Sequence, residues 1–223
     1  ERLFSMSTKK MPETIGKYKI VRLLGRGGAG TVYEAVNPQI GRRVAIKALK
    51  SIYSPDSQVA KRFLQEAFAA NQVTHPGIVN IFDYDKTQDD ITFFVMDFLD
   101  GITLARFMKK EKPCTLLRTI EIISQIAEAM AAAHEKGVIH RDLKPENIML
   151  VGSHELPSDL RAIVLDLGIA KLTSEYQRTD TAGLTTAQTT LGTPEYMAPE
   201  QCIDSSRVDE KTDVYALGLM IFE

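Results

Sequence analysis

The loop from Ile139 to Asn147 reads IHRDLKPEN and contains a carboxylate, an ammonium and an amide side chain close together in sequence. The carboxylate of Asp142 can take a proton from a hydroxyl group. The ammonium of Lys144 can neutralise negative charge on a phosphoryl group during transfer. The amide oxygen of Asn147 is a hard ligand that suits Mg²⁺. The loop therefore carries three groups whose chemistry fits phosphoryl transfer.

A second acidic motif, Asp166-Leu167-Gly168, follows nineteen residues after Asn147 at the end of an apolar strand. Asp166 and Asn147 together offer a pair of oxygen donors that suits magnesium. Taken alone, the tripeptide is more often an ordinary turn. Its interpretation as part of a metal site depends on the loop that precedes it.

A glycine-rich run, Gly25 to Gly30 (GRGGAG), lies upstream between two strand-like segments. Glycines let a backbone approach phosphate oxygens closely and present N–H donors to them. A P-loop would need Lys after the last glycine, where this chain has Thr31, and a dinucleotide-binding fold would need a helix there. A glycine-rich hairpin remains an alternative for the run taken alone.

Lys47 ends the strand-like run Val44 to Lys47 (VAIK), in which alternation places Ala45 and Lys47 on the same face. A lysine among apolar neighbours needs an anionic partner. Glu66 is a candidate, because the apolar residues around it form the inward stripe of a helix. A surface lysine and a surface glutamate are the simpler interpretation of each residue taken separately.

The composition is that of an ordinary globular chain. The 223 residues include 27 Lys plus Arg and 29 Asp plus Glu, with 44% hydrophobic and 25% charged residues. These values exclude wholesale disorder, and without a positive excess we expect no nucleic-acid partner. Two cysteines cannot form a disulfide scaffold, which favours a reducing, cytoplasmic setting. No apolar run of about 20 residues occurs, so we expect no membrane segment within this chain.

The pattern of the first hundred residues predicts strands over 18–24, 31–36, 43–49, 78–83 and 91–98, with one helix that Ser54-Pro55-Asp56 opens. After Asp100-Gly101 it predicts a helix over 104–109, strands over 148–151 and 162–165, and a Thr-rich stretch over 173–193. A long helix between them has one face formed by Ile120, Ile123, Ala127, Met130 and His134. We expect a tail over residues 1–16, a β-rich lobe over 17–99 and a mostly helical lobe over 100–223.

In this order the motifs resemble the signature set of eukaryotic-type serine/threonine protein kinases. The resemblance runs from about Tyr18 to the last residue, and the segments Gly192 to Glu200 (GTPEYMAPE) and Asp213 to Gly218 (DVYALG) agree with it. Gln201 and Leu167, which stands where most members carry Phe, resemble the bacterial branch. The resemblance implies an α+β, two-lobed protein-kinase fold. A small antiparallel β lobe with one helix is followed by a larger, mainly helical lobe that is incomplete at its C-terminus.

This resemblance implies transfer of phosphate from ATP, with Mg²⁺, to serine or threonine hydroxyls of protein substrates. It makes Asp142 the catalytic base, and Lys144 and Lys47 the phosphate contacts. The implied catalytic residues are Asp142, Lys144, Lys47 and Glu66, and the implied metal ligands are Asn147 and Asp166.

The resemblance also implies where the nucleotide binds. The glycine loop covers the phosphates, Met96 gates the back of the adenine pocket, and the hinge backbone bonds the adenine edge. The implied contacts are Gly25, Arg26, Gly27, Gly28, Ala29, Gly30, Val32, Ala45, Lys47, Met96, Asp97, Phe98, Leu99 and Met149.

Arg141 suggests a form of control, because in this family the arginine before the catalytic aspartate commonly pairs with a phosphorylated residue. The loop from Thr179 to Thr190 offers six threonines. We expect autophosphorylation there, by the protein itself or by a second copy that self-associates with it. A Thr-rich loop without a regulatory role is the alternative.

Three other functions remain open: a pseudokinase that only binds, a small-molecule phosphotransferase, and a regulatory fragment. The segment Val214 to Phe222 is almost wholly apolar, and a helix apolar on all sides must be buried. We therefore expect the native protein to continue beyond Glu223. Residues 1–223 alone are expected to be marginally stable, to aggregate or to use a partner's surface.

Overall fold

The structure is a computed structural model that describes residues 11–27, 30–49, 57–111, 114–156, 159–167, 194–203 and 208–223, without the side chains at positions 58, 59, 62, 66, 69 and 194. The chain divides into two compact units. Residues 1–55 and 82–98 form the first unit, and residues 56–81 and 99–223 form the second.

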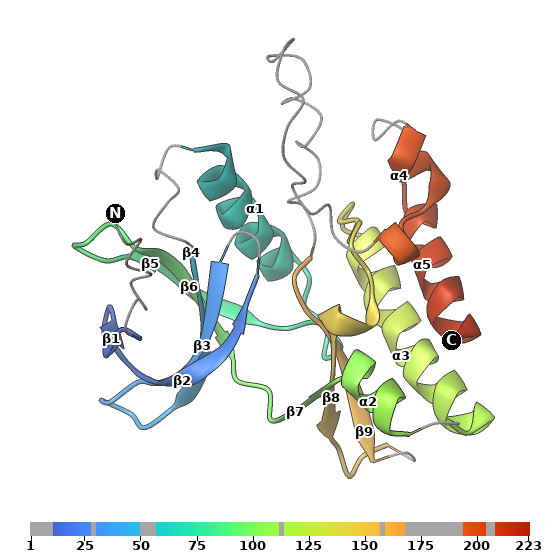
Figure 1. The fold of residues 1–223 in the computed structure, drawn as a ribbon, viewed down its shortest axis with the longest axis horizontal. Coiled ribbons are helices and arrows are strands. Elements are labelled where there is room, and N and C mark those ends of the chain that lie inside the picture. Colours follow the sequence, from blue (N-terminus) through green and yellow to red (C-terminus); the bar gives the residue numbers. More distant parts are fainter. Residues whose placement is uncertain are drawn as a thin grey trace, which may run out of the picture. The chain divides into compact units, whose positions relative to one another are not determined.

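A six-stranded sheet with the order β1-β2-β3-β4-β6-β5 forms the first unit (Figure 1). Its strands are β1 (Thr14–Ile15), β2 (Tyr18–Arg26), β3 (Gly30–Val36), β4 (Arg43–Leu49), β5 (Ile81–Lys86) and β6 (Thr92–Asp97). β1 to β4 pair antiparallel in sequence order, and β6 pairs antiparallel with β4. The predicted strands agree closely, except that the strand expected over 78–83 begins at Ile81. Its expected first residues pair elsewhere, because the Val79 amide donates to the Val164 carbonyl at 3.0 Å.

The two faces of this sheet have different contents. Alternate residues of the strands turn one set of apolar side chains into a common core, which includes Ile20, Ala35, Val44, Ile46, Ala48, Phe93 and Val95. The register pairs Val32 with Lys47, Lys47 with Phe94, and Ala45 with Met96. Directly paired residues lie on the same face, so these residues share the face opposite the core.

The second unit combines helices with a three-stranded antiparallel sheet of order β7-β8-β9 (Figure 1). The strands are β7 (Gly101–Thr103), β8 (Ile148–Gly152) and β9 (Leu160–Val164). The helices are α1 (Gln58–Gln72), α2 (Leu104–Lys110), α3 (Leu116–His134), α4 (Pro199–Ile203) and α5 (Lys211–Phe222), and two 3₁₀ turns span Pro145–Asn147 and Pro194–Tyr196.

Side-chain hydroxyls set the starts of three of these helices. The Ser57 hydroxyl accepts from the Ala60 amide at the start of α1, and Thr103 and Thr115 cap α2 and α3 in the same way. Such a cap satisfies an N–H group that has no partner within the helix. The predicted opening of α1 at Ser54-Pro55-Asp56 lies outside the described residues, and the described cap is Ser57.

The buried face of α3 differs from the predicted one. The buried residues are Ile122, Ile126, Ala129, Met130 and Ala133, whereas Ile120 is 53% exposed. Gln125 explains the rotation, because it pairs with the outer edge of β9. Its side chain donates to the Leu160 carbonyl at 3.1 Å and accepts from the Ala162 amide at 2.9 Å. When Gln125 faces this strand edge and bonds its polar groups, the buried residues that begin at Ile122 face the same way, toward the core.

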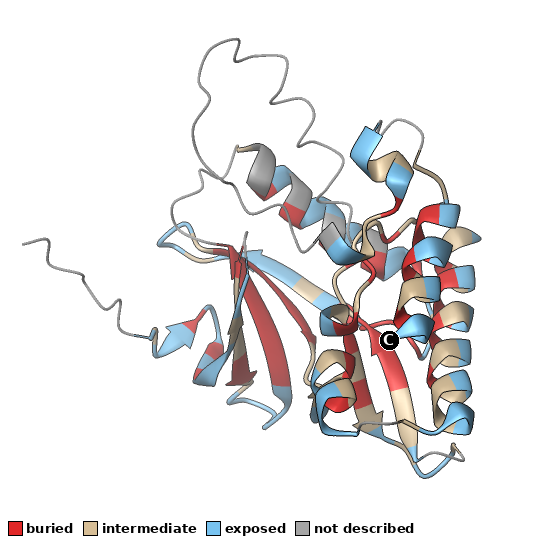
Figure 2. Cartoon of the chain, turned by 45° about the vertical axis from the view of Figure 1, so that its right-hand side comes forward, coloured by how far each residue is buried: buried red, intermediate tan, exposed pale blue. Residues whose placement is uncertain are grey.

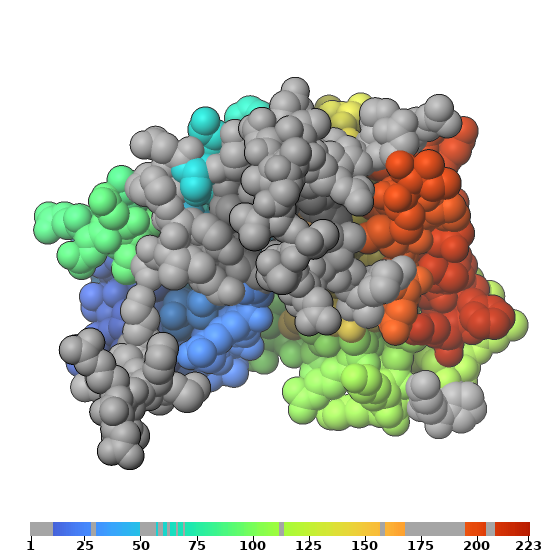
Figure 3. Space-filling model, turned by 45° about the horizontal axis from the view of Figure 1, so that its top comes forward, coloured from blue at the N-terminus to red at the C-terminus, as the bar shows by residue number. Residues whose placement is uncertain are grey.

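Helix α5 is buried on one side only. Figure 2 shows both buried and exposed parts along this last helix. Ala216 and Met220 are buried, while Val214, Ile221 and Phe222 are exposed. The prediction that this apolar segment is buried in the native protein is not tested by the described chain, in which one side of the helix is exposed. Figure 3 shows α4 and α5 (orange and red) on the surface of the second unit. Together with α2 and α3, the end of α5 borders an open groove of about 600 Å³.

Candidate active site

The β8–β9 pair brings the two predicted metal ligands to one end of a small sheet. Ile148 lies opposite Val164, and the Leu165 amide donates to the Asn147 carbonyl at 2.8 Å. The pairing of β8 with β9 thus ends with Asn147 beside Leu165, the residue directly before Asp166. Two motifs that are separated in sequence therefore meet at the same edge.

The catalytic loop converges on Asp142. The Lys144 ammonium lies 3.0 Å from Asp142 Oδ2. The Asn147 amide nitrogen donates to the Asp142 carbonyl at 2.8 Å and also lies 3.3 Å from Oδ2. Two donors at one carboxylate oxygen fix the rotamer of Asp142, which is what a positioned base requires.

The residues present fit a magnesium ion. Because the Asn147 nitrogen donates to Asp142, the amide oxygen is not the group used in that bond and can serve as a ligand. Asp166 supplies a carboxylate from a left-handed backbone conformation with φ of 48°. The described part of the chain contains no cluster of three His, Cys, Asp or Glu residues that could hold a metal. Two protein oxygens suffice for Mg²⁺, which usually completes its shell with water and substrate phosphates.

His140 connects the two motifs from within the core. It is fully buried, and its Nε2 lies 2.9 Å from the Leu165 carbonyl. Its Nδ1 accepts from the Asp142 amide at 3.2 Å. A carbonyl can only accept, so the proton is on Nε2 and the ring is neutral. His140 thereby fixes the spacing between Asp142 and the strand end that carries Asp166.

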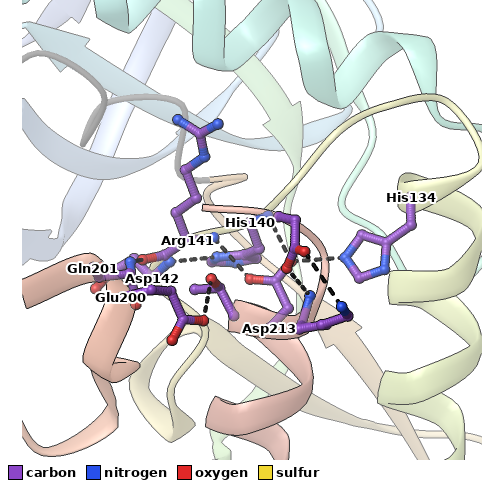
Figure 4. Close-up of polar contacts among 10 residues, drawn as sticks. His134, His140, Arg141, Asp142, Glu200, Gln201 and Asp213 are labelled. Carbon is purple, nitrogen blue, oxygen red and sulfur yellow. Dashed lines mark hydrogen bonds and ion pairs between the residues drawn. The ribbon is translucent and has the colours of Figure 1, made fainter. Parts of the chain in front are cut away.

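Asp213, in the first turn of α5, anchors the backbone of the catalytic loop (Figure 4). Its carboxylate accepts from the amides of His140 and Arg141, both at 2.8 Å. His134 Nε2, at the end of α3, lies 2.8 Å from the same carboxylate. Asp213 is 2% exposed, so its charge is satisfied entirely within this network.

Arg141 is strained at its backbone and incompletely bonded at its side chain. Its φ is 63°, a left-handed conformation that costs a non-glycine residue about 1–3 kcal/mol. Its Nη1 is buried without a hydrogen-bond partner among the described residues. Burial lowers the pKa of the guanidinium, while the nearby Asp213 carboxylate opposes that shift. Figure 4 shows the side chain extending away from the network around Asp213.

Two polar residues of helix α4 connect it to its neighbours, Glu200 to α5 and Gln201 to the catalytic loop (Figure 4). The Thr212 hydroxyl donates to Glu200 Oε1 at 3.0 Å, which links α4 to α5. Gln201 accepts from the Ala198 amide at 3.0 Å and donates to the Arg141 carbonyl at 2.8 Å. The helix is therefore joined both to α5 and to the residue before Asp142.

In the first unit, the predicted nucleotide contacts share the sheet face opposite the core. Lys47, Ala45 and Met96 are all buried, and Val32 is half-buried. The Lys47 ammonium lies 5.6 Å from the centre of the Phe94 ring. The sequence predicted that Ala45 and Lys47 share one face, and the register confirms it.

The glycine loop is described at its two ends. The Gly27 amide donates to the Gly30 carbonyl at 2.9 Å. A Cβ at Gly30 would lie 2.8 Å from the Ala48 carbonyl oxygen, so this glycine is required by the close approach of β4. Gly28 and Ala29 lie outside the described residues.

Two consecutive arginines hold the end of β6, where the hinge was predicted. Arg42 Nη2 lies 2.8 Å from Asp97 Oδ1, and the Arg43 guanidinium lies 4.1 Å from the centre of the Phe98 ring. The same Arg43 bonds the buried carboxylate of Glu34 at 2.9 Å. Side chains on both faces of the sheet therefore restrain the predicted hinge.

The remaining predicted site residues are only partly placed. Met149 is half-buried in β8, opposite Ile163, and Leu99 lies just before β7. Arg26 ends β2 and is exposed. The Glu66 side chain and the Thr179–Thr190 loop lie outside the described residues, so the Lys47–Glu66 pair stays a prediction.

Sequence reasoning overlooked several groups that hold this site together. His134 was assigned only to a helix face, and Gln201 was considered only as a mark of the bacterial branch. Glu34, a carboxylate 4% exposed, was not singled out. One signal for Glu34 was present, since it is an acid within the β-rich run 31–36 with arginines at 22 and 43 nearby. The contacts of His134 and Gln201 arise from tertiary structure alone.

Comparison with known proteins gives the family. A model described as the protein kinase domain matches residues 18–223, so the chain belongs to the protein kinase family. Serine/threonine-protein kinase pkn3 of Myxococcus xanthus is 36% identical over 223 residues, which cover 98% of this chain and 40% of that protein. Serine/threonine-protein kinase PrkC of Bacillus subtilis is 36% identical over 93% of this chain and 30% of its own length.

A solved structure shares the fold. The PknI kinase domain of Mycobacterium tuberculosis matches with a TM-score of 0.68 and 28% sequence identity, over 95% of this chain and 76% of that one. This match and the bacterial relatives confirm the predicted kinase fold and the predicted resemblance to the bacterial branch. The chain spans less than half the length of these curated relatives. Among the described residues, no helix combines the length and the apolar character needed to cross a membrane.

Proposed function

We propose that the protein is a serine/threonine protein kinase that transfers phosphate from magnesium-bound ATP to protein hydroxyls. The observation that carries the proposal is the convergence of Lys144 and Asn147 on the Asp142 carboxylate. Asn147 and the strand end before Asp166 meet at the same edge. A base, a cation and two metal donors in one place match the needs of phosphoryl transfer, in which positioning and charge neutralisation dominate.

In this proposal each residue has one task. Asp142 orients the substrate hydroxyl and accepts its proton, and Lys144 neutralises charge on the transferred group. Asn147 and Asp166 would hold Mg²⁺, which supplies charge neutralisation at the phosphates when it is bound. Lys47, held by Glu66, would contact the α- and β-phosphates.

The first unit contributes the proposed nucleotide contacts. Val32, Ala45 and Met96 would contact the adenine, and the backbone of Asp97 to Leu99 would bond its edge. Their common sheet face supports this assignment. We propose the lobe boundary near residues 99–100, with a β lobe over 17–99 and a helical lobe over 100–223. The proposed partners are proteins with accessible serine or threonine residues.

A radiolabel-transfer assay tests the proposed function. The full-length protein, incubated with labelled ATP and a generic protein substrate, should transfer label in the presence of Mg²⁺ and lose transfer when the metal is chelated. Nucleotide binding without transfer would instead indicate a pseudokinase. Label found only on small molecules would indicate a phosphotransferase of another class.

Phosphorylation of the Thr179–Thr190 loop is a further expected result. The buried Nη1 of Arg141 has no partner among the described residues, and a phosphate would supply a doubly charged acceptor. After incubation with Mg-ATP, peptide mapping by mass spectrometry should locate phosphate in this loop. Replacement of Arg141 by Gln should abolish the activation that accompanies it. Full activity with an unmodified loop would contradict this regulation.

A further inference from the structure

The peptide that joins Arg141 to Asp142 is the feature from which this inference starts. Arg141 has a φ of 63°, and the next residue is the proposed base. A residue in this region persists only where its surroundings hold it, because a relaxed backbone would leave the conformation. The direction of the Asp142 side chain therefore depends on whatever holds Arg141.

Two side chains from outside the loop hold the backbone of Arg141 at its two polar groups (Figure 4). Asp213 accepts from its N–H at 2.8 Å, and Gln201 donates to its C=O at 2.8 Å. Asp213 belongs to α5 and Gln201 to α4. Together they satisfy both hydrogen-bonding groups of the strained residue.

The orientation of the Gln201 amide is fixed by its two partners. Its Oε1 accepts from the Ala198 amide, which can only donate. Its Nε2 then faces the Arg141 carbonyl, which can only accept. A flipped amide would oppose donor to donor and acceptor to acceptor, so only this orientation of the amide makes both bonds.

We propose that Gln201 is a positioning residue that couples the Ala198–Gln201 segment to Asp142 through the Arg141 carbonyl. The proposal rests on the kinase activity proposed above and adds a residue to it. When the Ala198 amide is in place, Gln201 holds the Arg141–Asp142 peptide in the conformation that aims the base. When this segment moves, the peptide loses one of its two supports. The placement of α4 thereby affects the chemical step without any contact between Gln201 and the reacting atoms.

The position of α4 argues against a role limited to packing. The helix has five residues and none of them is buried. Cys202 and Ile203, which follow Gln201 within the same helix, are exposed. Gln201 therefore contributes two hydrogen bonds to the fold and little buried apolar surface.

Two substitutions in the full-length protein test the proposal. Gln201→Met keeps the length of the side chain and removes both hydrogen bonds. Gln201→Glu keeps the acceptor for Ala198 but places a carboxylate oxygen against the Arg141 carbonyl. We expect both to lower kcat by about 10- to 100-fold, the range that small misplacements of a catalytic group cause. The KM for ATP should stay within about twofold, because Gln201 contacts no proposed nucleotide residue. The matched control is Cys202→Ser, on the exposed side of the same helix.

A double-mutant cycle separates positioning from loss of structure. If Gln201 acts through Asp142, adding Gln201→Met to the Asp142→Asn variant should lower kcat by less than about twofold further, since the base is already absent. The proposal would be overturned if the fold-losses in kcat of the two single variants multiplied in the double variant. An unchanged kcat in both Gln201 variants would also overturn it. Thermal unfolding and nucleotide binding check the fold of each protein, and a variant that unfolds is replaced by the other in the cycle. Absence of transfer by the unaltered protein would instead refute the proposed function.

Discussion

Replacement of Asp142 by Asn should reduce phosphoryl transfer by a factor on the order of 10²–10⁴, which is the contribution of a positioned base. Asparagine has nearly the same shape, and the loop keeps the support of His140 and Asp213. Nucleotide binding should therefore survive while turnover is lost. Single-turnover transfer and fluorescence titration with a nucleotide analogue measure the two quantities separately.

Asp166→Asn provides the contrast for this experiment. It removes the proposed metal carboxylate, so it should weaken Mg-ATP binding as well as transfer. Lys47→Met should likewise nearly abolish transfer, because it removes a proposed phosphate contact. A protein that retains full turnover after Asp142→Asn would not be using this residue as its base, and the kinase proposal would fall with it.

Replacement of Asp213 by Ala should damage both stability and activity. It leaves the buried amide of His140 and the partly buried amide of Arg141 without their acceptor, at a cost of up to about 1–3 kcal/mol for each group. For a chain of this size we expect the midpoint temperature of thermal unfolding to fall by on the order of 5–10 °C. The strained Arg141 would also relax, so kcat should fall by about 10²-fold.

Asp209→Ala is the matched control for Asp213→Ala. Asp209 is also an acid near the start of α5, but its side chain is 47% exposed, and among the described residues it bonds the Lys211 amide and ammonium. Calorimetry and kinetics on both variants should show a small change for Asp209 and a large one for Asp213. Equal effects would mean that the bonds to the catalytic loop are not the source of the loss.

Local patterns were enough to predict most strands of the first unit, although not β1 or the bounds of β5. Strand β4 was predicted with both of its ends, because a short β-rich run lies between turn residues, and the two-residue period of a strand then assigns its faces. The same period put Ala45 and Lys47 on one face before any partner strand was known. The catalytic loop could be found because Asp142, Lys144 and Asn147 lie within six residues of one another.

Tertiary contacts explain what the sequence could not provide. The inward face of α3 depends on Gln125, whose partners in β9 lie 35 and 37 residues away. His134, which periodicity placed only on a helix face, bonds Asp213 across 79 residues. No local pattern records such distances, so periodicity selected the wrong stripe and missed the role of His134.

The two-faced sheet of the first unit has a consequence for how such a protein can change. Neighbouring positions along β4, such as Val44 and Ala45, belong to different faces and are subject to different demands. Variation at the core positions is constrained by folding, whereas variation one residue further along alters the face that we propose contacts the nucleotide. Because the period is two, ligand preference can diverge among descendants of one ancestor while the fold persists. Inhibitor resistance should arise along the same alternate positions.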